Sequence, residues 1–467
     1  MDYQKTKTLI DAEFENEVIP NLSEFIKIDN LSPSFDKEWN TNGKLEQAAK
    51  FCLDWALLQG IEGIKGEVIK DADKTPLIFI EIEAKNSSKN YMLYGHFDKQ
   101  PHFSGWAEGL GPITPVIRDG KLYGRGGADD GYSLFSSICA IKTIQQLGGS
   151  HGRVVLVVEG SEESGSPHLM SYIEALKDRI GKIDLMVCLD SGALNYDTLW
   201  VTTSLRGLAM IDVTVEVLDE AIHSGTGSGF VADSFMILRN ILDRIENSKT
   251  GKVIDEFQVE IPQKRLEDAQ KASSILKEKV LDRIKIKNGV SPLSNDYTQL
   301  LLNTTWRPTL TVTGQDGLPP VEIAGNVLRS STSVRLSVRL PPTLDAKYAS
   351  EFLDNLIKKD PPHNCKISTI IRHPGSGWSA QVFSDKLHQT LEKSSKNLWG
   401  QDYLCFGEGG SIPFIKNLND FFPECEILVI GVLGPNSNAH CCNEFLHIDY
   451  CKNITNTLAH TLNDFAN

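Results

Sequence analysis

Four apolar segments of β-strand length lie in the first 190 residues, with a helical segment among them. They are rich in leucine or β-branched residues and cover 77–84, 92–98, 153–160 and 184–190. From about Gly131, apolar residues recur at helical spacing until Gly148 and Gly149, a pair typical of a helix end. Strands with little polar alternation are buried on both faces, so we expect an α/β sheet covered by helices on both sides.

From about Thr203 the chain changes to strands in which apolar and polar residues alternate. These strands are predicted at 208–219, 307–314, 333–342 and 365–373. A period of two indicates a sheet with one face in solvent and helices on the other. Near Pro374 the first pattern returns, with an apolar strand at 426–434 and a closing helix. We therefore predict an α/β domain made of residues 1–202 and 376–467, interrupted by an inserted α+β domain at 203–375.

The composition of the chain argues against several classes of function. A chain of 467 residues is long enough for two domains. Its formal charge of −14 disfavours nucleic acid and anionic membranes as partners, and no apolar run approaches the ~18 residues of a membrane span. Acids interrupt the apolar positions of the N-terminal segment, which favours an amphipathic helix over a signal peptide. Nine scattered cysteines without CxxC spacing favour free thiols, so we expect a cytoplasmic protein.

His96 and Asp98 stand two apart at the end of the second apolar segment. Alternate residues of a strand point to the same face. His96 can therefore offer one ring nitrogen to a metal ion while Asp98 holds the other ring N–H and fixes the tautomer.

Further metal-type ligands follow in order along the chain. They are Asp129 and Asp130, Glu162 and Glu163, Asp190, and His440. Four of the five segments directly follow an apolar strand, and open α/β sheets place their sites at the carboxyl ends of strands. Taken singly, each residue could have a purely structural role, as a helix cap, a strand end or a buried histidine. Their joint, ordered occurrence favours a site.

Charge balance indicates how many cations such a cluster can hold. Two divalent cations are balanced by three carboxylates, those of Asp129, Glu163 and Asp190, together with one hydroxide. A single ion would leave the carboxylates under-compensated. Two ions ~3.5 to 4 Å apart that share a bridging water are an arrangement used for hydrolysis.

These motifs resemble those of the co-catalytic zinc metallopeptidase family that holds aminoacylase, carnosinase, cytosolic non-specific dipeptidase and succinyl-diaminopimelate desuccinylase. The resemblance covers nearly the whole chain, and EESGS and GEGGSIP are most similar to the dipeptidase and carnosinase branch. It implies a zinc-peptidase-like catalytic domain with an inserted lid and dimerisation domain. It also implies a cis peptide bond between Asp129 and Asp130.

The resemblance implies a role for each candidate. Glu162 would be the general base, and Asp98 would orient His96. The metal ligands would be His96 and Asp190 for one ion, Glu163 and His440 for the other, and Asp129 for both. Zinc fits these ligands, with manganese or cobalt as alternatives.

A homodimer through the inserted domain is also implied. His223 would reach into the partner's site to polarise the scissile carbonyl once the lid closes. Positions that match substrate contacts of that branch are Asn326, Arg339, His373, Gly410 and Ser411. His223 and His373 could instead be surface histidines of exposed loops, and Arg335 is an alternative cation on the strand of Arg339.

The sequence departs from the family pattern at four positions. Gly131 stands where Lys or Arg is usual, Lys99 where an apolar residue is common, and Cys441 and Cys442 follow the metal-type His440. These departures bear on metal preference and oxidation. A phosphate-binding reading of GRGGADDG is disfavoured, because the motif lacks a GK[ST] ending and its two acids would repel phosphate.

The sequence thus predicts a dinuclear metal-dependent hydrolase of dipeptides or other small amides with a free carboxylate, acting through a bridging water and Glu162. The first alternative is an N-acyl amino acid deacylase with the same machinery. A second is a catalytically silent metal-binding protein of the same fold. Glu162 argues against the silent protein, because a structural site needs no free carboxylate beside its ligands.

Overall fold

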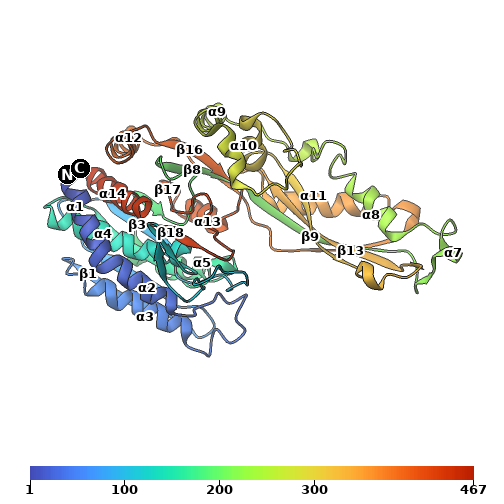
Figure 1. Cartoon of the computed structure of the whole chain (residues 1–467), viewed down its shortest axis with the longest axis horizontal. Coiled ribbons are helices and arrows are strands. Elements are labelled where there is room, and N and C mark those ends of the chain that lie inside the picture. The colour runs from blue at the N-terminus through green and yellow to red at the C-terminus, as the bar shows by residue number, and fades with distance from the viewer. Residues whose placement is uncertain (467) are drawn as a thin grey trace.

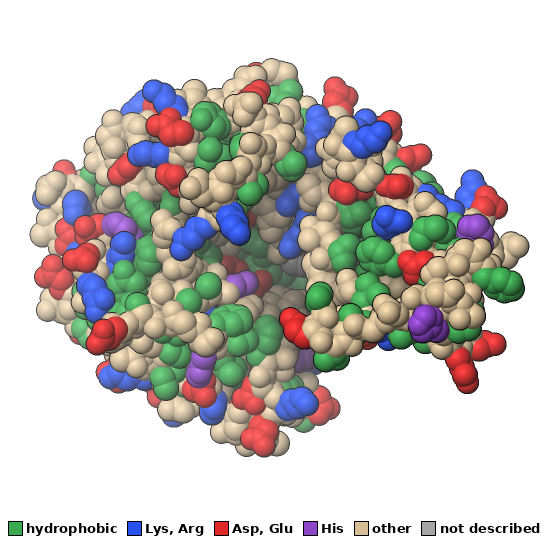
Figure 2. All heavy atoms as spheres, turned by 45° about the vertical axis from the view of Figure 1, so that its right-hand side comes forward, with side chains coloured by type: hydrophobic (Ala, Val, Ile, Leu, Met, Phe, Trp, Pro, Cys, Tyr) green, Lys and Arg blue, Asp and Glu red, His purple; other side chains and the backbone are tan. Residues whose placement is uncertain are grey.

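The computed structural model describes residues 1–466, apart from the side chains at positions 283 and 413. It has two lobes: a larger one that holds both chain ends, and a smaller one that extends from it along β9 (Gly207–Glu216) and β13 (Ser331–Leu340) (Figure 1). Figure 2 shows that the surface is hollowed between the two lobes. Two lobes agree with the inserted domain that the sequence pattern predicts.

A nine-stranded mixed sheet forms the centre of the large lobe. Its strands are β1 (Ile64–Ile69), β2 (Leu77–Ile82), β3 (Asn90–His96), β6 (Arg153–Glu159), β7 (Leu185–Cys188), β8 (Trp200–Leu205), β15 (Trp378–Ser379), β16 (Leu404–Glu408) and β17 (Glu426–Val429). The order is β1-β2-β6-β3-β7-β17-β8-β15, with β16 paired to β8. The four strands β6, β3, β7 and β17 run parallel to one another, so their carboxyl ends meet at one edge.

Helices cover both faces of this sheet, as the near-continuous apolar strands predict. One face carries α1 (Tyr3–Glu13), α2 (Ile19–Lys27), α3 (Lys44–Leu57), α4 (Tyr132–Gln146), α12 (Asp385–Trp399) and α14 (Ile448–Phe465). The other carries α5 (Leu169–Ala175), α6 (Lys177–Ile180) and α13 (Pro413–Phe421). The predicted helix from Gly131 to the glycine pair is confirmed as α4, and the closing helix as α14.

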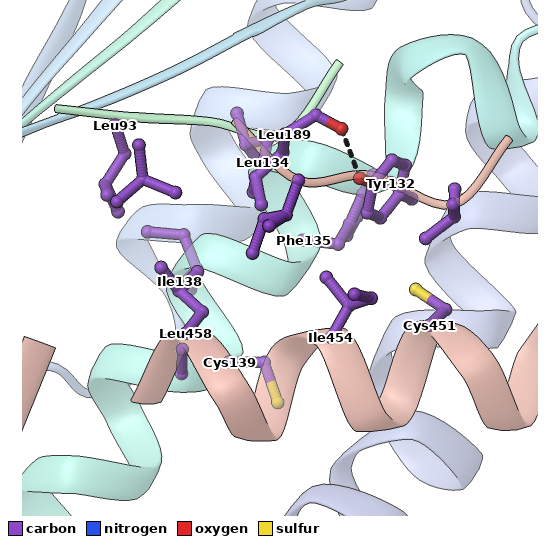
Figure 3. Close-up of a cluster of buried hydrophobic side chains, with 14 of the residues drawn as sticks. Leu93, Tyr132, Leu134, Phe135, Ile138, Cys139, Leu189, Cys451, Ile454 and Leu458 are labelled. Carbon is purple, nitrogen blue, oxygen red and sulfur yellow. Dashed lines mark hydrogen bonds between the residues drawn. The ribbon is translucent and has the colours of Figure 1, made fainter. Parts of the chain in front are cut away.

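The packing of α4 against α14 and the sheet positions the start of α4. Phe135 and Ile138 face Ile454 and Leu458 in one buried cluster (Figure 3). At the first turn the hydroxyl of Tyr132 donates to the backbone carbonyl of Leu189. The end of β7 is therefore tied to the beginning of α4.

The small lobe is built on a four-stranded antiparallel sheet. Its order is β11 (Thr309–Asp316), β13, β9 and β14 (Lys366–Ile371). Apolar residues of β9 and β13 pack against α8 (Ser234–Leu242) and α11 (Ala346–Lys358). On the opposite, wetter face Asp212 pairs with Arg335 and Arg372. The predicted alternation of a buried and a solvated face is confirmed.

Two helices of the predicted insert contact the large lobe. α9 (Gln263–Leu276) and α10 (Tyr297–Thr305) pack near β16, and Ala272 and Leu301 belong to the large hydrophobic core. Arg265 of α9 donates to the carbonyl of Ala380. The domain boundaries at 203 and 375 remain a prediction. The segment between them forms the small lobe, but its helices α9 and α10 also pack on the large lobe.

Close backbone contacts mark the junction of the lobes. A Cβ atom on Gly377 would lie 2.5 Å from the carbonyl oxygen of Leu205, and one on Gly207 would lie 2.9 Å from that of Gly375. The two connecting segments can run side by side only because these positions lack side chains.

Smaller elements complete the chain. β4 (Val116–Arg118), β5 (Lys121–Tyr123) and β18 (Phe445–His447) form one small sheet, and β10 (Ile222–His223) pairs with β12 (Val327–Leu328) beside α7 (Ser224–Gly227). None of the helices in residues 1–466 combines the length and apolar character of a membrane-spanning segment.

Candidate active site

His96 is the last residue of β3 and is fully buried. Its Nδ1 lies 3.1 Å from the backbone carbonyl oxygen of Asp98 and 3.4 Å from a carboxylate oxygen of the same residue. A proton on Nδ1 leaves Nε2 as the free lone pair, and Nε2 lies 3.3 Å from Oδ1 of Asp129. Asp98 therefore contacts the ring through its backbone as well as its side chain, which are the contacts that its predicted orienting role requires.

The carboxylate of Asp98 has a second contact that the sequence did not suggest. Its two oxygens accept the backbone N–H groups of Glu162 and Glu163, each at 3.0 Å. Both acids follow β6 in a short 3₁₀ turn, Glu162–Ser164. One aspartate thus fixes both the predicted histidine ligand and the turn that carries the predicted base.

Asp129 lies in a buried turn just before α4, and its peptide bond to Asp130 is cis, as expected. The backbone N–H groups of Gly126, Ala128 and Asp129 all point at the carboxylate of Glu444. Asp130 is also buried, and its carboxylate accepts the backbone N–H of His96 at 3.2 Å. Hydrogen bonds to the buried carboxylates of Glu444 and Asp130 therefore fix the turn that carries Asp129.

The predicted ligands form two groups that share one residue. His96, Asp129 and Asp190 can each offer an atom within 4.8 Å of the other two, and so can Asp129, Glu163 and His440. In the second group Nε2 of His440 lies 3.0 Å from Asp129 and 3.2 Å from Glu163. All five predicted ligands are brought together, and Glu162 lies beside them, 4.0 Å from Nε2 of His96.

The electrostatics of the cluster reflect how closely its buried carboxylates lie together. Burial raises the pKa of Asp190 to about 6 and that of Glu163 to about 7. For Glu162, burial and then the negative charge of Asp190 raise the pKa well above its usual range. Against the effect of burial, His440 and His96 lower the pKa of Asp129, and bound cations would relieve the repulsion among the other carboxylates.

The donor set fits divalent metal ions. Two imidazole nitrogens and three carboxylates match the ligands of zinc, and manganese or cobalt can use the same atoms. Among the described residues, Oε1 of Glu163 is buried and has no hydrogen-bond partner. Such an oxygen is costly to bury unless a cation or water meets it, so the pocket is suited to an ion beside Glu163.

Arg339 and Ser411 are brought together across the lobe junction. Nη1 of Arg339, on β13, donates to Oγ of Ser411 at 2.9 Å. Ser411 and the unhindered Gly410 follow β16. Arg206 is buried nearby and donates to the carbonyl of Gly409 at 3.1 Å. Arg206 was not predicted from the sequence, because no motif or pattern marks a single arginine between two strands as a site residue.

Three predicted residues are not brought to the cluster within this chain. His223 and Asn326 are exposed on the β10–β12 ribbon beside α7, at the far end of the small lobe (Figure 1). They are neighbours there, because the backbone N–H of Ser224 donates to the carbonyl of Asn326 at 2.9 Å. His373 is exposed on the connection between β14 and β15.

The hollow between the lobes has the character of a charged site. Figure 2 shows acidic and histidine side chains at its floor and basic side chains on its wall. A ligand in the hollow would therefore meet side chains of both charges.

Three buried charged residues support the site, and the sequence assigned a role to none of them. Glu444 is fully buried and pairs with buried Arg125. Lys99, one of the departures from the family pattern, reaches back to the end of α2, where its ammonium group donates to the carbonyls of Phe25 and Ile28 at 3.0 and 2.7 Å. A cation at a helix C-terminus is favourable, which explains a lysine where an apolar residue is common.

Comparisons with known proteins agree with this geometry. Residues 92–464 match the peptidase family M20/M25/M40. The chain is 26% identical over 402 residues to the cysteinylglycine-S-conjugate dipeptidase of Corynebacterium striatum, with 85% of each chain covered. It is 26% identical over 468 residues to the Cys-Gly metallodipeptidase DUG1 of Saccharomyces cerevisiae, covering 91% of this chain and 94% of that one.

Solved structures show the same fold. The dipeptidase Dug1p from Saccharomyces cerevisiae has a TM-score of 0.78 at 23% identity, with 100% of this chain and 98% of that chain covered. Human carnosine dipeptidase 1 has a TM-score of 0.77 at 20% identity, with 99% and 98% covered. The chain belongs to the peptidase family M20/M25/M40 and is a metallopeptidase.

Proposed function

We propose that this protein hydrolyses dipeptides with a free carboxylate, using two divalent cations held in the shared ligand cluster. The observation that carries the proposal is that Asp129 belongs to two ligand groups at once, while Glu162 lies 4.0 Å from His96 of the first group and belongs to neither group. A site that only stored metal would need no such additional carboxylate.

His96 and Asp190 would hold one ion, Glu163 and His440 the other, and Asp129 both. When bound, the two cations supply Lewis acidity that makes a water molecule easier to deprotonate and a carbonyl easier to attack. Zinc is the metal we propose, because imidazole and carboxylate ligands in this number suit it, with manganese or cobalt as alternatives.

Glu162 is the proposed general base. Its carboxylate accepts a proton from the attacking water and later returns it to the departing amine. The raised pKa of Glu162, caused by burial and by Asp190, suits an acid that must both take up and release a proton. Asp98 supports this role because it holds the backbone N–H of Glu162 in place.

The substrate carboxylate is proposed to meet Arg339. The planar guanidinium can bind a carboxylate with two parallel hydrogen bonds, and its neighbour Ser411 can add a third. A free carboxylate is common to dipeptides and N-acyl amino acids, so deacylation remains the second candidate for this site. Two relatives named as dipeptidases, each covered along most of its length, favour the dipeptide.

We further propose a homodimer formed through the small lobe, with His223 and Asn326 acting in the partner's site. The far end of that lobe exposes Phe230 by 94%, Val321 by 87% and Ile323 by 73%. Exposed apolar side chains gathered at one end of a domain are typical of an interface. Contact there would cover these side chains and bring His223 within reach of a second chain.

A cytoplasmic location is also proposed. All nine cysteines are free, and five of them are buried without a partner thiol. Free thiols in this number suit a reducing compartment.

One experiment separates the candidate functions. Protein purified without chelator is assayed against a panel of free dipeptides and a matched panel of acetylated amino acids, and its metal content is measured on the same sample. We expect two equivalents of metal per chain and turnover of dipeptides. Turnover of the acetylated panel alone would establish the deacylase, and two equivalents of metal without turnover of either panel would establish the silent protein.

A further inference from the structure

Cys441 and Cys442 directly follow the proposed ligand His440, and they are accessible. Cys441 is exposed and Cys442 is partly exposed, whereas most other thiols of the chain are buried. Their Sγ atoms lie 4.0 Å apart. A small oxidant in solution can therefore reach this pair more readily than the buried thiols.

The peptide group between the two cysteines is part of the site's support. Its carbonyl oxygen, that of Cys441, accepts a hydrogen bond from Nη2 of Arg125. The other end of the same guanidinium, Nη1, donates to Glu444 at 2.6 Å. Glu444 in turn accepts the backbone N–H of Asp129 at 3.2 Å. One chain of contacts thus connects the two cysteines to the proposed bridging ligand.

We propose that Cys441 and Cys442 form a reversible oxidation site, at which a peroxide closes a disulfide that disorganises the metal cluster. In the first step the sulfur of Cys441 attacks a peroxide oxygen; the O–O bond breaks, and sulfenic acid and water form. In the second step the thiol of Cys442 attacks the sulfenic sulfur, a second water leaves, and the S–S bond forms. Two thiols have lost two electrons and two protons, and the peroxide has been reduced to two waters.

The ring closed by this bond does not fit the present backbone. Neighbouring Cα atoms are about 3.8 Å apart across a trans peptide, whereas disulfides usually join Cα atoms roughly 4.4 to 6.8 Å apart. The peptide between the cysteines must therefore distort, and its carbonyl oxygen leaves Arg125. Because His440 is the adjacent residue and already has a positive φ of 57°, the distortion reaches the ligand directly.

The same strain makes the oxidation reversible. Strained and exposed disulfides have higher reduction potentials than structural ones and are readily reduced by thiols. The reduced pair is thus compatible with an ordered cluster, and the oxidised pair is not. The metal roles in this inference rest on the proposed function, but the disulfide itself does not.

The test treats the metal-loaded protein with hydrogen peroxide and then with dithiothreitol. Peptide mass spectrometry reports the disulfide, elemental analysis reports bound metal, and hydrogen exchange reports the order of residues 125–129. We expect the wild type to form the 441–442 disulfide, to lose metal and dipeptidase activity, and to recover both when it is reduced and metal is supplied. Cys442→Ser should keep its metal and activity at the same peroxide dose.

Two further variants serve as controls for the peroxide experiment. Cys365→Ser removes a partly exposed thiol in the small lobe and should respond like the wild type. Cys442→Ala replaces the serine variant if that variant folds poorly. Absence of the disulfide, a disulfide that changes neither metal content nor exchange, or equal losses in the wild type and the Cys442 variant would each overturn the inference. If no metal binds at all, the proposed function fails, while mass and exchange still test the disulfide.

Discussion

Arg125 donates from Nη1 to Oε2 of Glu444 over 2.6 Å, and both side chains are buried. They are 319 residues apart in the sequence. The pair joins the turn that carries Asp129 to the loop that carries His440. Asp129 and His440, two proposed ligands of the same ion, are therefore held close together by side chains that bind no metal.

Replacing Glu444 with glutamine should destabilise the protein and weaken its metal site. Glutamine keeps the shape but leaves the buried guanidinium of Arg125 without its counter-charge, and losing one partner of a buried pair costs about 3 to 5 kcal/mol. We expect a lower denaturation midpoint in urea and metal affinity reduced by roughly 10- to 100-fold, the range for a group that supports metal ligands. Urea titration and metal titration measure the two effects.

Glu67→Gln is the matched control. Glu67 pairs with Arg179 at 2.7 Å, but both side chains are about half exposed. Exposed pairs contribute ~1 kcal/mol or less. If Glu444→Gln proved as mild as this control, the buried pair would not be what orders the ligand loops.

Lys99→Met should lower stability more than it lowers turnover by the folded enzyme. Methionine keeps an apolar stem, but the carbonyls at the end of α2 lose their donor, and each unsatisfied buried group costs about 1 to 3 kcal/mol. Thermal denaturation checks the loss, and kcat of the folded fraction checks the site. Lys50→Met, which removes an exposed ammonium group paired with Asp54, is the control and should change stability little. An equally small change at both positions would contradict the capping role of Lys99.

The fold was predictable in those segments where burial determines the order of apolar and polar residues. β3 and β6 have mainly apolar interiors and are buried along nearly their whole length because both faces are covered, whereas β9 alternates because one face is wet. The ligands could be found for the same reason, since four of their five segments follow such strands directly. Their assigned roles remain predictions, because geometry alone does not distinguish a base from a ligand.

The rest depends on contacts that leave no local pattern. The sequence around Glu444 does not distinguish it from an ordinary acidic residue of a loop, and only folding brings it to Arg125. The helices α9 and α10 lie inside the predicted insert, and only tertiary packing decides that they also cover the large sheet. Lys99 was noticed as a departure, but its meaning required the position of α2.

Glu162→Gln should keep both metals while losing turnover. The amide cannot accept the water's proton, so kcat should fall by about 10² to 10⁴, the usual contribution of a general base. Glu163→Gln, one residue along, should instead lose metal, because it replaces a proposed ligand. Elemental analysis and steady-state kinetics on both variants separate the roles. Loss of metal from the Glu162 variant would mean that the two assignments are wrong.

His223 should act on the partner's site and not on its own. His223→Ala and Glu162→Gln should each be nearly inactive as homodimers. Mixed dimers contain one composite site with both groups intact, so subunit exchange should restore part of the activity. Differently tagged chains allow the mixed dimers to be purified and verified. Verified mixed dimers without any recovery would place His223 outside the partner's chemistry.

Arg339 should recognise the substrate's carboxylate, and the structure supplies its control. Arg339 is half-buried beside Ser411, whereas Arg335 pairs with Asp212 on the wet face of the same strand. A charged hydrogen bond of ~1.5 to 3 kcal/mol corresponds to roughly 10- to 150-fold in kcat/KM. We expect this loss when Arg339→Ala acts on a free dipeptide.

The same change should matter little for the dipeptide amide, because that substrate already lacks the anion. Arg335→Ala should leave both substrates nearly unaffected. The measurement compares kcat/KM for wild type and both variants on the two substrates. If Arg339→Ala slowed both substrates equally, its role would be to hold the loop of Ser411, and Arg206, which is buried against Gly409, would be the next cation to test.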